Sequence, residues 1–455
     1  MTSKSSYSDR APIGAETPSR AAEVKRARTV GLLLGVGAML VSLRSPIWPS
    51  VVNVSAVLVI AALAVAALTS SQGSLARLRV TALDVVFVSY ILIRVIVECI
   101  NSTDFSVPFG SGTVLDLGLG YVALLACRIV VASYESFFAV LMGLAVPGVA
   151  VAAIAVVQIL GPSETSNFLI QHFSSGGLET RISAGWEIRG TSTIGHWTAL
   201  GGYLSFIAAI FASRIVSDRN QGVTNRWVWV GLIVVLMGQV STLTFATIAM
   251  TAVVISVMLF RVGVRPVHLF IGLTAAVVVW MTIGDMLVSR LDKQTYASSA
   301  GTRNYLFLPE SVAFRVDVWI NESIPAIMER PLTGWGIGTY RYLGTSASSD
   351  NLRWISPESE WIRTAITAGI PTLAWQIAML AIVVVAMNRL RSAVDGKFVD
   401  PLFAAVITLV IASFIHSHIA NRGVPLVLWP VVGACIALSM VLSRTESSTE
   451  QKGGL

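Results

Sequence analysis

The chain has 455 residues, of which 54% are hydrophobic and only 13% are charged, with a mean hydropathy of +0.74. Because a soluble domain carries about a quarter charged residues, this composition excludes an ordinary soluble protein and predicts an integral membrane protein. The net charge of +7 does not indicate nucleic-acid binding, since the basic residues concentrate in loops on one predicted side of the membrane.

Twelve apolar stretches approach the roughly 20 residues that a membrane-spanning helix needs. They lie at about 29–43, 50–69, 80–100, 113–133, 136–160, 194–213, 227–242, 243–260, 268–288, 361–387, 401–418 and 424–442. The first is short, and only the polar run 239-QVSTLT-244 separates two of the others, so a count of eleven to thirteen also fits. The predicted fold is therefore an all-α membrane protein with about twelve transmembrane helices.

Lysine and arginine residues in the loops predict the orientation, because they favour the cytoplasmic side. Nineteen lie in the tails and loops of one predicted side, against two, Arg44 and Arg422, in the short loops of the other. Both termini are thus predicted to be cytoplasmic. The resulting parts are a disordered tail at 1–28, nine spans at 29–288 with an outer loop at 161–193, a large outer loop at 289–360, three spans at 361–442 and a second disordered tail at 443–455.

The large loop at 289–360 is the most distinctive part of the chain, with seven Lys/Arg, eight Asp/Glu and several aromatic residues. Loops of this length are usually functional or disordered, and this one has the apolar content of a folded segment. Apolar residues at helical spacing predict an amphipathic helix over 309–329 at the outer membrane surface. The glycines of 334-GWGIG-338 predict a tight turn.

Arg315, Trp319, 331-PLTGWGIGTY-340 and 358-ESEWIRTAITAGI-370 resemble the late signature of the O-antigen ligase and Wzy-type polysaccharide polymerase superfamily. That signature is an Arg followed by a Trp, a Pro-Leu-x-Gly-x-Gly turn, and a His-Asn helix start leading to a Gly. The segment 189-RGTSTIGHWTALGGYL-204 is similar to the family's Arg-x-x-Gly segment.

One position departs from this signature. With Gly369 aligned, Glu358 stands where the family usually has its His, and Ser359 stands where it has its Asn. Either this branch uses a carboxylate in place of the imidazole, or the site has been lost or rearranged. We favour the carboxylate.

The resemblance implies transfer of a glycan from a polyprenyl-pyrophosphate carrier to an acceptor hydroxyl at the outer face of a bacterial cytoplasmic membrane. The displacement would be metal-independent, would need no cofactor and would invert the anomeric configuration. The acceptor would be another lipid-linked glycan for a polymerase, or a separate lipid or protein for a ligase, and the sequence does not distinguish these. Such an enzyme needs cations for the phosphates and a base for the hydroxyl.

Glu358 is the candidate base, and Arg315 is the candidate catalytic cation. Arg189 is a candidate pyrophosphate ligand, with Arg341 and Arg363 as lesser ones, because a guanidinium pairs with phosphate oxygens bidentately. Each residue has a structural alternative. An outer arginine can make a surface salt bridge, and Glu358 can be an ordinary acid in the first turn of the next helix.

Three more residues are candidates for substrate binding. Arg94 lies inside a predicted span, where ionisable residues are often functional, and can instead pair with Glu98 four residues later. His196 opens the sixth span, and Trp335 could stack on a sugar or simply lie at the membrane interface. The pair in 416-HSH-418 supplies too few ligands for a closed metal site, so no metal is predicted.

Two other classes of function remain open. A transporter or flippase of lipid-linked glycans would also have about twelve spans, although it would more often show repeated halves, and none are evident here. A scaffold of the same fold without catalysis is the third possibility. In the preferred reading the partners are the lipid-linked donor, a glycan, lipid or protein acceptor, and the bilayer, with no nucleic acid.

Overall fold

The computed structural model describes residues 18–44, 53–69, 79–105, 111–173, 176–263, 310–354, 356–393, 397–419, 421 and 423–453. These residues form helices joined by turns, with one isolated bridge between Leu43 and Phe173. The long helices are α1 (Pro18–Met39), α2 (Val54–Leu68), α4 (Ala82–Phe105), α5 (Ser111–Val130), α6 (Tyr134–Leu160), α9 (Trp197–Asn220), α10 (Arg226–Ser241), α11 (Phe245–Val262), α15 (Glu360–Ala393), α16 (Asp400–Ala412) and α17 (Pro425–Gly453).

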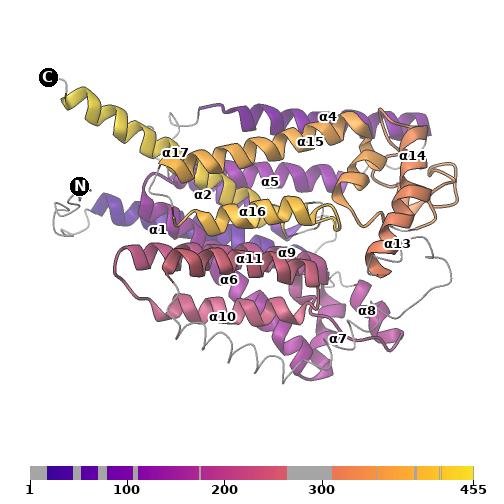
Figure 1. Cartoon of the computed structure of the whole chain (residues 1–455), viewed down its shortest axis with the longest axis horizontal. Helices are drawn as coiled ribbons and strands as arrows, with labels where there is room; N and C mark the ends of the chain where they lie inside the picture. The colour runs from indigo at the N-terminus through magenta and orange to yellow at the C-terminus, as the bar shows by residue number, and fades with distance from the viewer. Residues whose placement is uncertain are drawn as a thin grey trace.

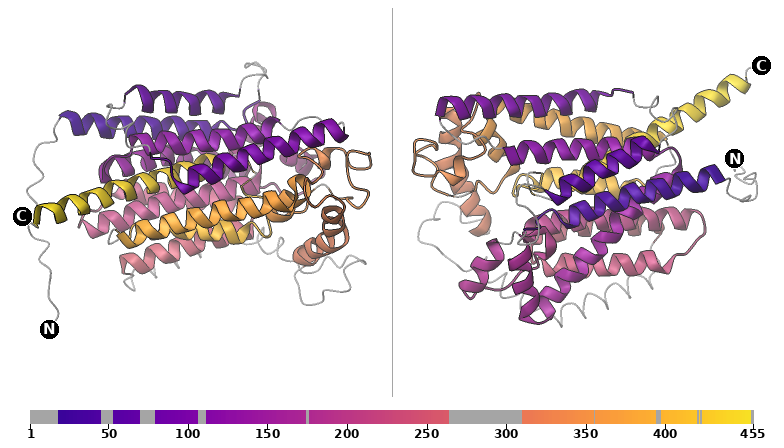
Figure 2. Two further views of the ribbon diagram at one scale, coloured as in Figure 1. Left: turned by 90° about the horizontal axis from the view of Figure 1, so that it is seen from above. Right: turned by 180° about the vertical axis from the view of Figure 1, so that it is seen from behind.

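Shorter elements gather at one end of this bundle. They are α7 (Ser163–His172), α8 (Gly176–Ser183), the 3₁₀ turn η1 (Ser192–Ile194), α13 (Glu310–Val318), the π-helical turn η2 (Trp319–Ser323), α14 (Ile324–Glu329) and the 3₁₀ turn η3 (Thr339–Arg341). The start of α1 and the end of α17 lie at the opposite end (Figure 1). Figure 2 shows the same separation from two further directions. We call the end that carries α7, α8, α13 and α14 the loop end.

The long helices are those of a membrane protein. By length and composition, α6, α9, α11, α15 and α17 can each cross a bilayer, and α2, α10 and α16 are shorter apolar helices. A helix overlaps every predicted span except 268–288, which lies outside the described residues. The prediction is therefore confirmed as an all-helical membrane protein, and not as a count of twelve spans. Large apolar side chains are exposed on outer helix faces, which suits contact with lipid: Ile60, Val88, Ile96, Val146, Ile233, Phe260 and Ile377.

Both predicted tails contain helix where disorder was expected. Helix α1 begins inside the segment 1–28, and α17 continues through the second tail as far as Gly453. The start of α1 is held against the start of α6, since Arg20 forms an ion pair with Glu135 and the Ser133 hydroxyl donates a 2.8 Å hydrogen bond to Glu23. Its alanines, arginines and lysine are also strong helix formers.

Both predicted long loops contain folded structure in their described parts. The segment 161–193 forms α7 and α8, and Leu169, Phe173 and Leu178 make a small apolar core beneath them. The predicted helix over 309–329 is present as the continuous run of α13, η2 and α14. A π-helical turn widens this run at Trp319–Ser323, a deviation that often occurs at functional sites.

The turn at 331–336 docks onto a break in α15. Gly369 has φ +81° and ψ 167°, so the helix is interrupted there. The turn satisfies the backbone groups that the break leaves unpaired, as non-helical backbone within a membrane protein requires. Its hydrogen bonds run from Trp335 N to Ile366 O (2.8 Å), from Gly336 N to Thr367 O (3.1 Å) and from Ile370 N to Pro331 O (2.7 Å).

Two glycines make this docking possible. A Cβ atom on Gly369 would lie 2.1 Å from the Leu332 carbonyl oxygen, and one on Gly334 would lie 2.5 Å from the Ile366 carbonyl oxygen. Both residues also have positive φ angles, which side chains disfavour. The glycine-rich motif therefore joins the large loop to α15 at the break around Gly369.

Candidate functional site

A cavity of about 960 Å³ opens at the loop end of the bundle. This volume lies within the range of small-molecule sites. Segments far apart in the chain line it: residues 181–198, 243–246, 312–315, 354–358 and 415–416. Three arginines and two glutamates are among the lining residues, together with several aromatic rings: Arg181, Arg189, Arg315, Glu187, Glu358, Trp186, Trp197, Phe314 and Trp354.

The segment carrying Arg189 is held by Gln158 of α6. The Gln158 amide oxygen accepts hydrogen bonds from the backbone N–H groups of Thr191 (2.9 Å) and Ser192 (3.0 Å). The Gln158 amide nitrogen donates to the Arg189 carbonyl oxygen at 3.3 Å. These contacts are buried, so they fix the backbone from which the Arg189 side chain reaches the cavity.

The opposite wall is built around Glu358. Helix α13 and the π-helical turn present Arg315 and Trp319 four residues apart, a spacing that puts both side chains on one face. Arg315 Nη2 donates to Glu358 Oε2 at 3.2 Å, and Trp319 Nε1 donates to the Pro357 carbonyl oxygen at 2.6 Å. The Arg and Trp of the large loop thus hold the segment that carries the predicted base.

The backbone at Glu358 is unusual. Glu358 has φ +54°, although non-glycine residues rarely adopt this region, and its N–H donates to the Ser356 hydroxyl at 3.2 Å. Helix α15 begins only at Glu360. Glu358 therefore lies just before the first turn of that helix. Backbone strain of this kind clusters at functional sites.

His416 also lies beside Glu358, a neighbour that sequence reasoning missed. Its Nδ1 is 3.7 Å from Glu358 Oε2, and its side chain is 15% exposed. Burial is the main cause that lowers the pKa of His416 well below 6.5, and the positive charges of Arg315 and Arg189 act in the same direction. His416 is therefore a neutral imidazole at neutral pH.

His196 contributes to the opposite wall and also to the fold. It is the N-cap of α9, where its Nδ1 accepts a 3.2 Å hydrogen bond from Thr198 N. Its ring stacks on Trp197 with centroids 4.3 Å apart. The imidazole is exposed at the cavity wall, so it serves both as the cap of α9 and as part of the lining.

Indole rings and guanidinium groups alternate along this wall. The Arg181 and Arg189 guanidinium carbons lie 5.3 and 5.1 Å from the ring centre of Trp197, and that of Arg181 lies 5.6 Å from Trp186. Trp186 is 59% exposed, and Trp354, near Glu358, is 42% exposed. The cavity therefore offers both cationic groups and open aromatic faces.

No protein-family model matches the chain, and no curated protein matches it significantly. The chemistry of the site therefore carries the interpretation. Guanidinium groups can bind phosphate oxygens, carboxylate and imidazole groups can accept a proton, and exposed indoles can stack on sugar rings. The described residues contain no group of three or more His, Cys, Asp or Glu side chains that could hold a metal ion.

Arg94 and Arg363, predicted as substrate ligands, line a separate cavity of about 30 Å³ together with Glu360. Arg94 Nη1 donates to the Thr367 hydroxyl at 3.3 Å. On the same helix, Glu98 accepts a 2.8 Å hydrogen bond from Ile337 N. These charged groups of α4 thus contact α15 and the glycine-rich segment, away from the large cavity.

The other two predicted ligands also lie outside the large cavity. Trp335 is buried, its Nε1 donates to the Ala326 carbonyl oxygen at 2.9 Å, and Arg330 covers its ring at 3.6 Å. Arg341 is exposed on η3 and does not line the cavity. Of the predicted residues, the structure brings together Arg189, His196, Arg315 and Glu358.

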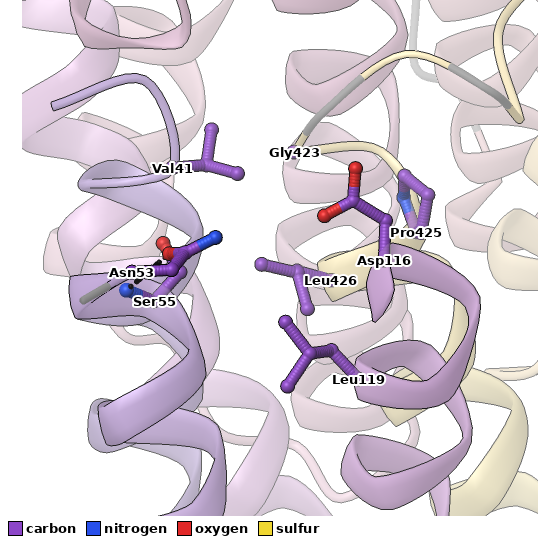
Figure 3. Close-up of a pocket in the computed structure, with 8 residues that line it drawn as sticks. All are labelled: Val41, Asn53, Ser55, Asp116, Leu119, Gly423, Pro425 and Leu426. Carbon is purple, nitrogen blue, oxygen red and sulfur yellow. Dashed lines mark hydrogen bonds between the residues drawn. The ribbon is translucent and has the colours of Figure 1, made fainter. Parts of the chain in front are cut away.

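A third cavity lies between α2, α5 and the start of α17 (Figure 3). Its volume of about 10 Å³ is at the lower limit for one water molecule. Asp116 lies at its edge near Pro425, and Asn53 caps α2 on the other side. This space is too small for a substrate.

Proposed function

We propose that the chain is a membrane glycosyltransferase of the O-antigen ligase and polysaccharide polymerase type. It would transfer a glycan from a polyprenyl-pyrophosphate carrier to an acceptor hydroxyl. The observation that carries this proposal is that Arg189, Arg315 and Glu358 line one cavity. Cations for a pyrophosphate and an acid–base group for a hydroxyl are the groups that such a reaction needs.

The arginines would bind the two phosphates and stabilise the negative charge that develops as the glycosyl bond to pyrophosphate breaks. The acceptor oxygen would attack the anomeric carbon from the opposite face, which inverts its configuration. The proton of the hydroxyl would pass to an acid–base group in the wall that Glu358 and His416 form. Arg181, Arg189 and Arg315 supply positive charge themselves, so the proposed reaction needs no metal ion.

The exposed indoles of Trp186 and Trp354 would provide stacking surfaces for the sugar rings. Stacking suits a glycan because the C–H face of a sugar is apolar while its hydroxyls remain free for water. The indole walls and the arginines together favour a donor that is both a sugar and a phosphate ester.

The cavity would open on the outer face of a bacterial cytoplasmic membrane. Support for this comes from the nineteen Lys/Arg residues on the side of the termini, against two in the short loops of the other side. The loop end, with the cavity, lies opposite the start of α1 and the end of α17. The acceptor is either a second lipid-linked glycan or a separate lipid or protein.

The test is reconstitution of the purified protein with the polyprenyl-pyrophosphate glycan of its native host and candidate acceptors, with and without EDTA. We expect an elongated or newly attached glycan, an equal amount of released polyprenyl pyrophosphate, an inverted anomeric centre, and no effect of EDTA. Movement of the intact donor across the vesicle membrane without transfer would instead establish the transporter. With neither transfer nor movement, only the scaffold would remain.

A further inference from the structure

Two histidines follow α16, and only the first reaches the large cavity. His418 is fully buried, and its two ring nitrogens have no hydrogen-bond partner among the described residues. His416 lines the cavity, with its Nδ1 directed at Glu358 Oε2 across 3.7 Å. Arg315 Nη2 lies 3.2 Å from the same carboxylate oxygen. Glu358 therefore stands between a guanidinium and an imidazole.

We propose that His416 takes the proton from the attacking hydroxyl and that Glu358 is a positioning residue for its imidazole. This inference rests on the proposed function, and it assigns the proton to one atom of the site. With Nδ1 directed at Glu358, Nε2 is the nitrogen left to accept a proton. The imidazole that the family signature has at the position of Glu358 would then be supplied from position 416.

The contacts of Glu358 support this division of roles. Its Oε2 already accepts a charge-assisted hydrogen bond from Arg315, and this contact favours the ionised carboxylate over the protonated acid. A carboxylate that orients an imidazole and stabilises the imidazolium is an established acid–base arrangement. The 3.7 Å separation exceeds a hydrogen bond, as is often the case for catalytic pairs before substrate binds.

The charges around His416 favour a base that acts only when the donor is present. The groups that face it are Glu358, Arg315, Arg189, His196 and His418. Burial first, and then the positive groups, lower the pKa of His416, so its ring is neutral and able to accept a proton. A bound pyrophosphate would offset the charge of the two arginines and make the protonated imidazole more stable.

The acceptor O–H bond breaks as its oxygen forms the new bond to the anomeric carbon, and the proton passes to Nε2 of His416. The bond between the anomeric carbon and the carrier oxygen breaks, and its electron pair leaves with the pyrophosphate. The imidazolium, paired with Glu358, then releases its proton to water or to the departing pyrophosphate.

The experiment is a single-turnover transfer assay from pH 5 to 9 with the lipid-linked donor and an acceptor. It compares wild type with His416→Gln, His416→Ala, Glu358→Gln and Glu358→Ala. His172→Gln is the matched control, because His172 lies on α7 outside the lining of the cavity. Donor binding, measured with a fluorescent polyprenyl-pyrophosphate glycan, and the elution profile show whether each variant is folded and loaded.

We expect both His416 variants to bind donor and to lose transfer by roughly 100-fold or more, the usual contribution of a general base. Added imidazole should restore part of the rate in His416→Ala. In Glu358→Gln the acid limb of the pH profile should move to lower pH, because the imidazolium loses its anionic partner. The His172→Gln control should match wild type.

Transfer within threefold of wild type in the His416 variants would overturn the inference and leave the glycosyltransferase standing. So would rescue of Glu358→Ala by acetate or formate without rescue of His416→Ala by imidazole, since the carboxylate would then be the base. If the wild type binds the donor and makes no product, the proposed function fails and this inference fails with it.

Discussion

Arg315 Nη2 lies 3.2 Å from Glu358 Oε2, although 43 residues separate the two in the chain. Trp319, one turn after Arg315, binds the carbonyl oxygen of the residue before Glu358. This pair joins the helix of the large loop to the start of α15 and places both charges on the cavity wall.

Replacing Arg315 should weaken donor binding. We expect Arg315→Ala to raise the Kd for a polyprenyl-pyrophosphate glycan by roughly 10- to 100-fold, because a charge-assisted hydrogen bond contributes about 1.5–3 kcal/mol. Arg315→Lys should recover only part of the loss, since an ammonium lacks the planar fork. Arg219→Ala, at the exposed end of α9, is the matched control. If both Arg315 variants bind the donor with the same Kd as the wild type, Arg315 is not part of the donor site.

The exposed tryptophans should contribute to glycan affinity. We expect Trp186→Ala and Trp354→Ala each to weaken binding of the donor's free oligosaccharide by about tenfold, measured by calorimetry, and Trp186→Phe to weaken it less. Trp227 is 71% exposed at the start of α10, outside the cavity, so Trp227→Ala serves as the control. If only the Trp227 variant loses affinity, or if no variant does, Trp186 and Trp354 do not stack on the glycan.

The docking of the glycine-rich turn onto the break in α15 should contribute to the stability of the fold. In Gly369→Ala the new methyl group would lie 2.1 Å from a carbonyl oxygen at φ +81°, so the backbone must shift. We expect the free energy of unfolding to fall by at least about 1–3 kcal/mol, the usual cost of such strain. Gly344 has φ +79° with nothing within 4 Å of the added carbon. Gly344→Ala therefore measures the stability cost of the positive φ angle without a steric clash. Similar thermal unfolding curves for both variants would show that the docking contact contributes little.

The helices could be predicted from the sequence because each long apolar run is a local signal. The large loop was predicted to be folded for the same reason, since apolar residues at helical spacing occur between 309 and 329. The tail predictions missed parts of α1 and α17, because contacts such as the Arg20–Glu135 ion pair depend on a distant helix. Such contacts between distant helices cannot be predicted from the composition of the tails.

The site could be predicted only in part. Arg189, His196, Arg315 and Glu358 were found through short motifs. His416 and Trp186 were not, because their place in the cavity depends on how distant helices pack. Trp335 was predicted as a sugar-binding residue, but spacing cannot show whether an indole faces a cavity or, as here, is buried under Arg330. The φ of +54° at Glu358 could not be predicted either, because the surrounding sequence has the pattern of a helix start.

Stability should fall between about pH 6.5 and pH 4. Burial lowers the pKa of His418 to about 4, so the folded chain keeps this ring neutral while the unfolded chain protonates it near 6.5. Stability is complete above the unfolded value and decreases as the pH falls toward the folded one.

Thermal unfolding across this range, for wild type and His418→Leu, checks the prediction. The variant should lose less stability on acidification, because the buried imidazole of His418 is gone. His172→Gln should follow the wild-type curve. Parallel curves for wild type and His418→Leu would show that His418 does not contribute to the acid sensitivity.

The most direct test of the account is a single-turnover assay with purified protein, the polyprenyl-pyrophosphate glycan of the native host and candidate acceptors. It compares wild type with Glu358→Gln, and Glu164→Gln on the exposed start of α7 serves as the control. We predict rapid glycan transfer by wild type and by the control, and a loss of roughly 100-fold or more in Glu358→Gln despite normal donor binding, because the imidazole loses the carboxylate that orients it. Equal rates in all three would contradict the central claim that the Glu358 cavity is the site of transfer.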